Sequence, residues 1–324
     1  MMNDKMIYLR KKDIEELNIG LREIIEIVEK VFFEKGMNRV EMPPKPGVHP
    51  KQDAFIHAMP AYIPSLNAVG VKWVSGFPEN YKRGLPYING LLILNDPDTG
   101  VPVCVMDCIW ITAWRTAAAT AVAAKYLANK NSETIGILGC GVQGRTNLEM
   151  LCEIFPIRYV KVFDIVDGKA KEYCKVMSSK LGIEIRPQVD PEHTVIDSEI
   201  VVTAGPFLKN PKPSLEFRWL KKGAFCCPLD LDSYLKPEVF EKADILYTDD
   251  VNQFKSFREK GYFKGLSRKI YDLGDLISGK VSGRESKEQI IISINIGIAL
   301  EDIALASLIY KKAKNLNVGI LLDL

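Results

Sequence analysis

The spacing of apolar residues predicts one helix followed by several short strands in the first hundred residues. Between positions 13 and 35 apolar side chains recur every three or four residues, which is typical of an amphipathic helix, and Asp13 is its expected N-cap. Strand-like runs then follow at 54–60, 68–74 and 90–94. A turn at 95–100 and a returning strand at 101–106 complete a hairpin. We expect an antiparallel sheet with one helix in this part of the chain.

The pattern changes in the middle of the chain, where strands alternate with helices. Asp107 is expected to cap a long alanine-rich helix that runs to about residue 128. Apolar runs then predict strands at 134–139, 159–163, 183–187, 199–204, 224–229 and 245–248. This alternation favours a doubly wound parallel sheet. The last part of the chain predicts a strand at 289–294, a helix from 297 to about 312 and a strand-like tail at 318–322.

A glycine-rich turn breaks the strand predicted at 134–139. In the pattern Gly139-x-Gly141-x-x-Gly144 the first glycine permits a tight turn, the second admits a pyrophosphate and the third lets the helix pack on the strand. The pyrophosphate would lie on the N–H groups at the start of the helix, at Val142 and Gln143. The turn therefore predicts a dinucleotide-binding α/β (Rossmann) domain.

Asp164 indicates which dinucleotide binds. It ends the next apolar run, about twenty residues after the last glycine of the turn, as the dinucleotide fingerprint requires. A carboxylate there can accept hydrogen bonds from both ribose hydroxyls of NAD and would repel the 2′-phosphate of NADP. An ordinary strand–turn–helix, with Asp164 capping a local group, is the alternative. The sequence predicts NAD as cofactor.

Composition excludes several other classes of protein. The chain has 324 residues, 47% of them apolar, and 43 basic residues against 41 acidic ones, so neither nucleic acid nor a membrane surface is an expected partner. No signal peptide or membrane span is recognisable. The seven cysteines lack CxxC spacing and the three histidines are not paired at helical spacing, so we expect no metal site. We expect a cytoplasmic protein with two domains.

Three basic residues are candidates for binding a substrate. Arg115 lies in an apolar helix, where its guanidinium needs a partner such as a carboxylate. Lys72 lies in an apolar strand, where an unpaired ammonium would be costly, and Lys45 follows two prolines. A surface or structural salt bridge is the alternative for each of them.

Two acids follow the strand predicted at 224–229. Asp230 and Asp232 lie at the carboxyl edge of the parallel sheet, where ligands collect, and they would share one face of an extended segment. One of them could act as a general base or a proton relay, and a helix cap is the alternative. Thr203, at the end of another predicted strand, is placed to touch the cofactor.

Several separated segments resemble the ornithine cyclodeaminase/mu-crystallin family of NAD(P)-dependent enzymes. The resemblance covers nearly the whole chain. Its most specific segments are Met59-Pro60, Gly70-Val-Lys-Trp-Val-Ser-Gly-Phe-Pro78, Thr112-Ala-Trp-Arg-Thr-Ala-Ala-Ala-Thr-Ala-Val-Ala-Ala-Lys-Tyr-Leu127 and Gly297-Ile-Ala-Leu-Glu-Asp302. It implies an NAD-binding domain, residues 114–297, inserted into a discontinuous substrate-binding domain formed by residues 1–113 and 298–324. It also implies a homodimer joined through the sheets of the substrate domains.

The same resemblance implies roles for the basic residues. Arg115 and Lys72 would bind the carboxylate of a substrate, and Lys72 would also assist proton transfer at the reacting nitrogen. Lys45 stands where relatives often carry an arginine for the same carboxylate. Arg115 would also contact the cofactor, as would Gly297, and Thr116 would neighbour the cofactor phosphates.

Counted from Gly223, Asp232 best matches the catalytic aspartate of the family. The segment after it is shorter here than in many relatives, which leaves Asp230, otherwise expected near the cofactor, as a rival. True ornithine cyclodeaminases carry a glutamate two residues before the Met-Pro pair, and this chain has His57 there. Histidine can bind a polar group but supplies no fixed negative charge for a side-chain ammonium.

The leading hypothesis is therefore an NAD(H)-dependent oxidoreductase acting at the C–N bond of a small amino or imino acid. One alternative is ornithine cyclodeaminase, which converts ornithine to proline and ammonia with bound NAD. Another is a non-catalytic binding protein like the crystallin members of the family. The identity of the substrate and the direction of the reaction stay open at this stage.

Overall fold

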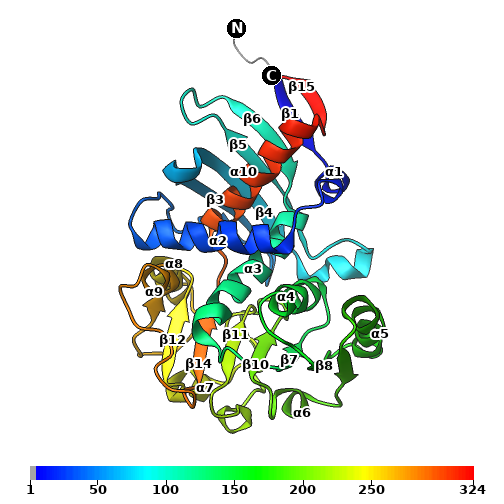
Figure 1. Ribbon diagram of the computed structural model, residues 1–324, viewed down its shortest axis with the longest axis vertical. Helices are drawn as coiled ribbons and strands as arrows, with labels where there is room; N and C mark the ends of the chain where they lie inside the picture. The colour runs from blue at the N-terminus through cyan, green and yellow to red at the C-terminus, as the bar shows by residue number, and fades with distance from the viewer. Residues whose placement is uncertain (1–4) are drawn as a thin grey trace. The chain divides into compact units, whose positions relative to one another are not determined.

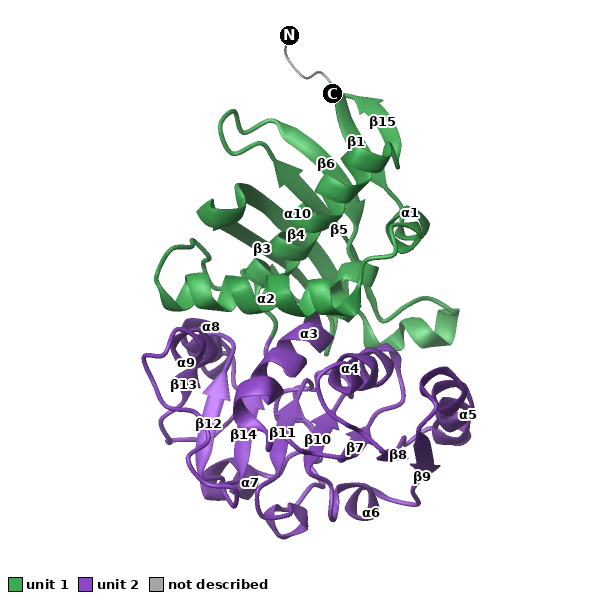
Figure 2. Cartoon of the chain, viewed as in Figure 1, with its two compact units in different colours: residues 1–115, 297–324 green, residues 116–296 purple. Residues whose placement is uncertain are grey.

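The computed structural model describes residues 5–324, whose strands form two sheets (Figure 1). The chain divides into two compact units (Figure 2). One unit takes the chain up to Arg115 together with Gly297–Leu324, and the other takes Thr116–Ile296. The division falls within helix α3 (Ile109–Leu127), whose first N–H groups are capped by the Asp107 carboxylate at 3.0 and 3.2 Å.

The sheet of the first unit has seven strands in the order β15-β1-β6-β5-β4-β3-β2. Neighbouring strands are antiparallel except β1 and β6, which are parallel, so the expectation of a purely antiparallel sheet is wrong. Since β1 and β6 are far apart in the sequence, no local turn signals their pairing. The bounds are β1 (Lys5–Leu9), β2 (Gly47–Val48), β3 (Phe55–Ile63), β4 (Ala68–Gly76), β5 (Ile88–Asn95), β6 (Pro102–Asp107) and β15 (Ile320–Asp323).

Helix α10 (Ala299–Leu316) packs on one face of this sheet, against β3, β4 and β5, and also contacts helix α2 (Leu21–Gly36). Residues alternate between buried and less buried along β3 and β4, as expected for a sheet covered on one face. Gly70 lies on the covered face, where an added Cβ would meet the Ile303 side chain at 3.2 Å. The short helices η1 (Pro64–Leu66) and η2 (Pro78–Arg83) follow β3 and β4.

The helix predicted over residues 13–35 is two helices in the structure. Helix α1 spans Lys11–Glu16, and α2 begins only at Leu21 after the N-cap Gly20. Asn18, with φ of 47°, breaks the run, although the apolar spacing continues through it. Asp13 is not an N-cap: it lies in the first turn of α1 and accepts the backbone N–H of the N-cap residue Arg10 at 2.8 Å.

The second unit contains eight strands in the order β13-β12-β14-β11-β10-β7-β8-β9, and every pair is parallel. The chain runs outward from β7 through β8 to β9 and then returns to β10 on the other side of β7, so the predicted doubly wound parallel sheet is confirmed. The bounds are β7 (Thr134–Leu138), β8 (Tyr159–Phe163), β9 (Glu184–Pro187), β10 (Ile200–Thr203), β11 (Phe225–Pro228), β12 (Ile245–Thr248), β13 (Tyr271–Asp272) and β14 (Ile291–Ile294).

Helices connect these strands. They are α4 (Val142–Cys152), α5 (Lys169–Leu181), α6 (Pro191–Val195), η3 (Phe217–Trp219), α7 (Pro237–Lys242), α8 (Val251–Glu259) and α9 (Leu273–Ile277). All seven cysteines are free thiols. Within residues 5–324, no helix is long and apolar enough to cross a membrane.

Candidate active site

The glycine turn after β7 has room for a phosphate on one side and is tightly packed on the other. Gly139 has φ of +107°, and a Cβ there would lie 2.6 Å from the Ala204 carbonyl. A Cβ on Gly144 would lie 2.1 Å from the Gly139 carbonyl, so α4 can approach the turn only with glycine at this position. Around Gly141 nothing lies within 4 Å of an added Cβ. This geometry fits the close approach of a dinucleotide pyrophosphate to the turn.

Asp164 follows β8 and lies against the glycine turn. Its Oδ2 accepts the backbone N–H of Cys140 at 2.8 Å, and its Oδ1 accepts that of Val166 at 2.9 Å. The carboxylate therefore has the local capping role that the sequence left open. A carboxylate has about four acceptor positions, so the same oxygens can also accept ribose hydroxyls. This arrangement fits a residue that both shapes the loop and binds NAD.

Arg115 and Lys72 belong to one buried ionic cluster in the first unit. The Lys72 Nζ lies 2.7 Å from the Asp302 Oδ2, and the side chains are 1% and 0% exposed. The Arg115 Nη1 lies 2.7 Å from the Glu301 Oε2, and its Nε lies 3.0 Å from the Asp302 Oδ1. The sequence predicts that these two cations meet a carboxylate, and in the structure each faces a carboxylate of the chain itself.

The local fold explains why these four side chains meet. Lys72 alternates along β4 with the exposed Trp73, so it points to the face that α10 covers. Glu301 and Asp302 lie in the first turn of α10, where the positive end of the helix dipole favours carboxylates. Gly297, with φ of +83°, precedes this helix, and a Cβ there would lie 2.5 Å from the Arg115 Nη1. Only glycine lets the guanidinium lie so close to this backbone.

Lys45 and His57 join the same region. The buried Lys45 donates from Nζ to the Gly297 carbonyl at 3.0 Å. His57 is buried and stacks on Phe55, with the ring centroids 4.4 Å apart. It lies opposite Val74, two residues from Lys72 on the same face of the sheet. The structure thus brings together the residues that the sequence predicts to bind the substrate. Gly297, which the sequence predicts to contact the cofactor, lies in the first unit beside Arg115 and Lys45.

Three basic side chains, Lys45, Lys72 and Arg115, and two acidic ones, Glu301 and Asp302, meet in this buried region. Burial lowers the pKa of Lys72; Arg115 acts in the same direction, whereas Asp302 and Cys108 oppose it. Burial also raises the pKa of the neighbouring Cys108 thiol to about 11, so this thiol stays protonated near neutral pH.

Asp230 lies just after β11 and is completely buried. Its Oδ1 accepts the Thr203 hydroxyl at 2.7 Å, and its Oδ2 accepts the Gly205 N–H at 2.8 Å. Burial raises the pKa of Asp230 to about 7, although both hydrogen bonds act against the rise. Thr203 thus lies at the end of β10 as predicted, and its hydroxyl donates a hydrogen bond to Asp230.

Asp232 has different partners, so the expectation that the two acids share one face of an extended segment is wrong. Leu231, with φ of 63°, bends the chain between them. The Asp232 Oδ2 accepts the Phe263 N–H at 2.7 Å, whereas its buried Oδ1 has no hydrogen-bond partner among residues 5–324. Burial raises the pKa of Asp232.

The remaining predicted residues lie in helices α3 and α4. Val142 is 60% exposed in the first turn of α4, followed by the half-buried Gln143. Thr116 follows Arg115 in α3. Sequence reasoning missed Glu301 and Asp302 as functional residues. Two adjacent acids at a predicted helix start were a usable signal, because the buried Lys72 and Arg115 both needed partners.

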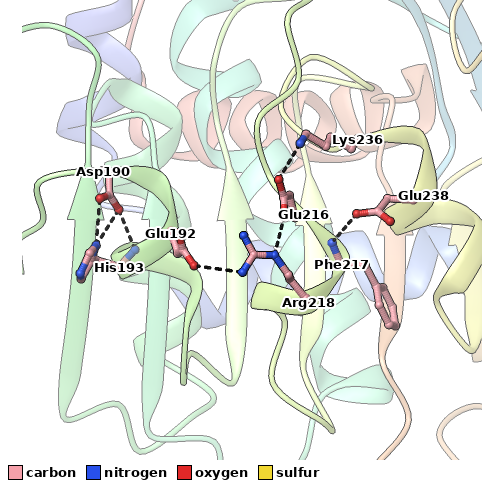
Figure 3. Close-up of polar contacts among 8 residues, drawn as sticks. All are labelled: Asp190, Glu192, His193, Glu216, Phe217, Arg218, Lys236 and Glu238. Carbon is pink, nitrogen blue, oxygen red and sulfur yellow. Dashed lines mark hydrogen bonds and ion pairs between the residues drawn. The ribbon is translucent and has the colours of Figure 1, made fainter.

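A second group of charges, on the surface of the second unit, is unrelated to these sites (Figure 3). Glu216 joins Arg218 at 2.6 Å and Lys236 at 2.7 Å, and Arg218 also reaches Glu192 at 3.8 Å. The His193 ring lies 2.8 Å from the Asp190 carboxylate, which caps α6. Because solvent screens exposed pairs, this network supplies a control for tests of the buried cluster.

Comparison with known proteins gives matches over almost the whole chain. Residues 3–317 match the model of the ornithine cyclodeaminase/mu-crystallin family. An alanine dehydrogenase of Archaeoglobus fulgidus is 34% identical over 323 residues, which cover 97% of this chain and 97% of that protein.

Solved structures agree with this match. The Δ1-pyrroline-2-carboxylate reductase of Thermococcus litoralis, in complex with NADH and L-proline, superimposes with a TM-score of 0.87 at 33% identity, covering 97% of this chain and 99% of the other. An archaeal alanine dehydrogenase dimer with bound NAD gives a TM-score of 0.88 at 32% identity, covering 98% and 99%.

Proposed function

Since the chain belongs to the ornithine cyclodeaminase/mu-crystallin family, we propose that its substrate is a small 2-amino or 2-imino acid whose carboxylate is bound by the buried cations of the first unit. The chain is an NAD-dependent oxidoreductase acting at the C–N bond of an amino or imino acid. Its relatives include an alanine dehydrogenase and a Δ1-pyrroline-2-carboxylate reductase. The proposal concerns which substrate is taken and which residues act on it.

The gathering of three buried cations, Lys45, Lys72 and Arg115, is the observation that supports this proposal. Arginine and lysine bind carboxylates through charge-assisted hydrogen bonds. The fork of Arg115 together with the Lys45 ammonium would bind a substrate carboxylate and fix its direction. Loss of these contacts with the substrate carboxylate is expected to raise KM and to lower kcat/KM.

The second unit supplies a fitting place for the cofactor. The turn at Gly139, Gly141 and Gly144 would hold the pyrophosphate, Asp164 the ribose, and Thr116 and Thr203 would lie near the rest of the cofactor. NAD, when bound, accepts or supplies a hydride. The open space at Gly141 supports this assignment, because an additional side chain there would point where the phosphate is expected.

Two residues are proposed for proton transfer. Lys72, whose pKa is lowered by burial, would hold or release a proton at the substrate nitrogen. Asp232 would exchange a proton with the substrate, because one of its buried oxygens has acceptor capacity that no described residue uses. Asp230 is the less favoured of the two acids, because it is completely buried and its oxygens accept hydrogen bonds from Thr203 and Gly205.

The same geometry does not favour a diamino acid such as ornithine. Glu301 and Asp302 already face Arg115 and Lys72, and His57 occupies the position where a fixed negative charge would meet a side-chain ammonium. The test is an NADH absorbance assay with alanine, proline, ornithine and other amino acids plus NAD, and with pyrroline- and piperideine-carboxylates, or 2-oxo acids plus ammonia, plus NADH. Turnover of a small 2-imino acid supports the proposal, and proline formation from ornithine without net NADH would contradict it.

We also propose that the chain forms a homodimer through the sheet face that α10 does not cover. Trp73 and Leu91 lie opposite each other on β4 and β5 and are 53% and 45% exposed. Adjacent exposed apolar side chains of this size are typical of an interface. Light scattering should give a dimer for the wild type and a monomer for W73E.

The free cysteines agree with a cytoplasmic location.

A further inference from the structure

The first turn of α10 carries two buried acids for which the proposed function has no direct use. Glu301 and Asp302 are both 0% exposed. We propose that Asp302 is a positioning residue that fixes the Lys72 ammonium and the Arg115 guanidinium relative to each other, with Glu301 holding the second nitrogen of the guanidinium. This inference rests on the proposed function, because it explains how the groups that bind and protonate the substrate are oriented.

A single carboxylate joins the two cations. One oxygen of Asp302 lies 2.7 Å from the Lys72 Nζ and the other lies 3.0 Å from the Arg115 Nε. Glu301 adds a contact of 2.7 Å to the Nη1 of Arg115. The guanidinium is therefore hydrogen-bonded to Glu301 at Nη1 and lies within ion-pair distance of Asp302 at Nε, so two carboxylates limit its position.

The rest of the fold keeps the two acids in place. Helix α10 packs on β3 and β4, the strands that carry His57 and Lys72. The Gly297 backbone lies next to the guanidinium and also accepts the Lys45 ammonium. The start of α10 is thus the point from which three cations on separate elements are oriented. A positional change of about 1 Å in such a group can cost about 10²-fold in rate.

Asp302 also controls the protonation of Lys72. The charged and titratable groups that act on Lys72 are Asp302 on α10, Arg115 on α3 and Cys108 just before α3. Asp302 is the partner in direct contact that favours the ammonium, whereas burial and Arg115 favour the neutral amine. Any close carboxylate raises the pKa of its lysine partner, so the titration of Lys72 reports this contact and the kinetic parameters report whether the contact orients the reacting groups.

The test compares D302N with E301Q and with the surface control E216Q. The titration midpoint of the Lys72 Nζ is measured by NMR of ¹⁵N-lysine-labelled protein, which needs no turnover. We expect D302N to lower this midpoint by about 1–3 pH units, as for loss of a close opposite charge. E301Q should lower it much less, because Glu301 faces Arg115, and E216Q should leave it unchanged.

Kinetics with the substrate found in the panel give the second readout. D302N should lower kcat/KM by about 10²-fold and move the alkaline limb of its pH profile to lower pH. E301Q should mainly raise KM, with the alkaline limb little changed, and E216Q should match the wild type. An unchanged Lys72 midpoint in D302N, or equal shifts in D302N and E301Q, would overturn the inference.

The variant D302E keeps the test decisive if D302N fails to fold. It retains the carboxylate charge but displaces it, so kcat/KM should fall while the Lys72 midpoint moves less than in a neutral variant. Wild-type kcat/KM in D302E would contradict the inference. If no amino or imino acid is turned over but D302N still lowers the midpoint, the proposed substrate class is wrong and the role of Asp302 stands.

Discussion

Substitution of Arg115 by methionine should destabilise the first unit strongly, because it removes a cation that faces two buried carboxylates, Glu301 and Asp302. Breaking a buried ion pair by removal of one partner costs about 3–5 kcal/mol, and the 0% exposure of Glu301 gives solvent no route to reduce this cost. Asp302 keeps Lys72 as a partner at 2.7 Å, so its share of the cost should be smaller.

The double variant R115M/E301Q should recover much of this loss, because it removes both charges of the pair together. Neutral replacement of a buried pair is often close to neutral for stability. We therefore expect the two substitutions to couple by about 2 kcal/mol or more, within the range for residues in one network. R115M alone should lower Tm by about 6–20 °C, at roughly 2–4 °C per kcal/mol.

Urea unfolding of the wild type, both single variants and the double variant measures this coupling directly. E216Q is the matched control for loss of a glutamate charge in an ion pair, and its midpoint should equal that of the wild type. Strictly additive effects of R115M and E301Q, or an R115M protein as stable as the wild type, would refute the reasoning.

Three further predictions concern the second unit. Burial raises the pKa of Asp230 to about 7, above the 3.8 of an unperturbed aspartate, so wild-type stability should fall as pH rises from about 4 to 7. The variant D230N should lack this fall in stability. Urea midpoints that depend on pH equally in the two proteins would contradict this prediction. D164S should weaken NAD binding by about 10- to 100-fold and favour NADP, measured by titration with both cofactors; unchanged preference would exclude Asp164 from ribose binding. D232N should lower kcat by about 10²–10⁴-fold, and a D232N enzyme with normal kcat would exclude proton transfer by this residue.

The second unit was the part of the fold that the sequence predicted best. Parallel strands buried on both faces appear as continuous apolar runs, and each of the predicted strands between 134 and 248 is present within one residue at either end. The glycine turn was equally clear, because positions 139, 141 and 144 are constrained by the backbone itself. Apolar runs and glycine positions therefore sufficed to predict the strands and the turn, because both are set by residues close together in the sequence.

The first unit was harder to predict because its pairing is not local. The parallel pairing of β1 with β6 joins residues about a hundred positions apart, and the break at Asn18 interrupts an apolar pattern that continues on both sides. The partners of Lys72 and Arg115 lie about 190 or more residues further along the chain, in α10. Sequence reasoning identified two cations that needed anions, but only the fold shows that Glu301 and Asp302 supply them.

The most direct test of the account is NADH oxidation followed at 340 nm with a small 2-imino acid, for the wild type and R115M. Δ1-Pyrroline-2-carboxylate and the imine of pyruvate, formed with ammonia, are the first substrates to try. We expect turnover by the wild type and a loss of several orders of magnitude in kcat/KM for R115M, as for loss of a desolvated charge pair. NADH that binds tightly without turnover of any such acid, or equal kcat/KM in the two proteins, would contradict the central claim.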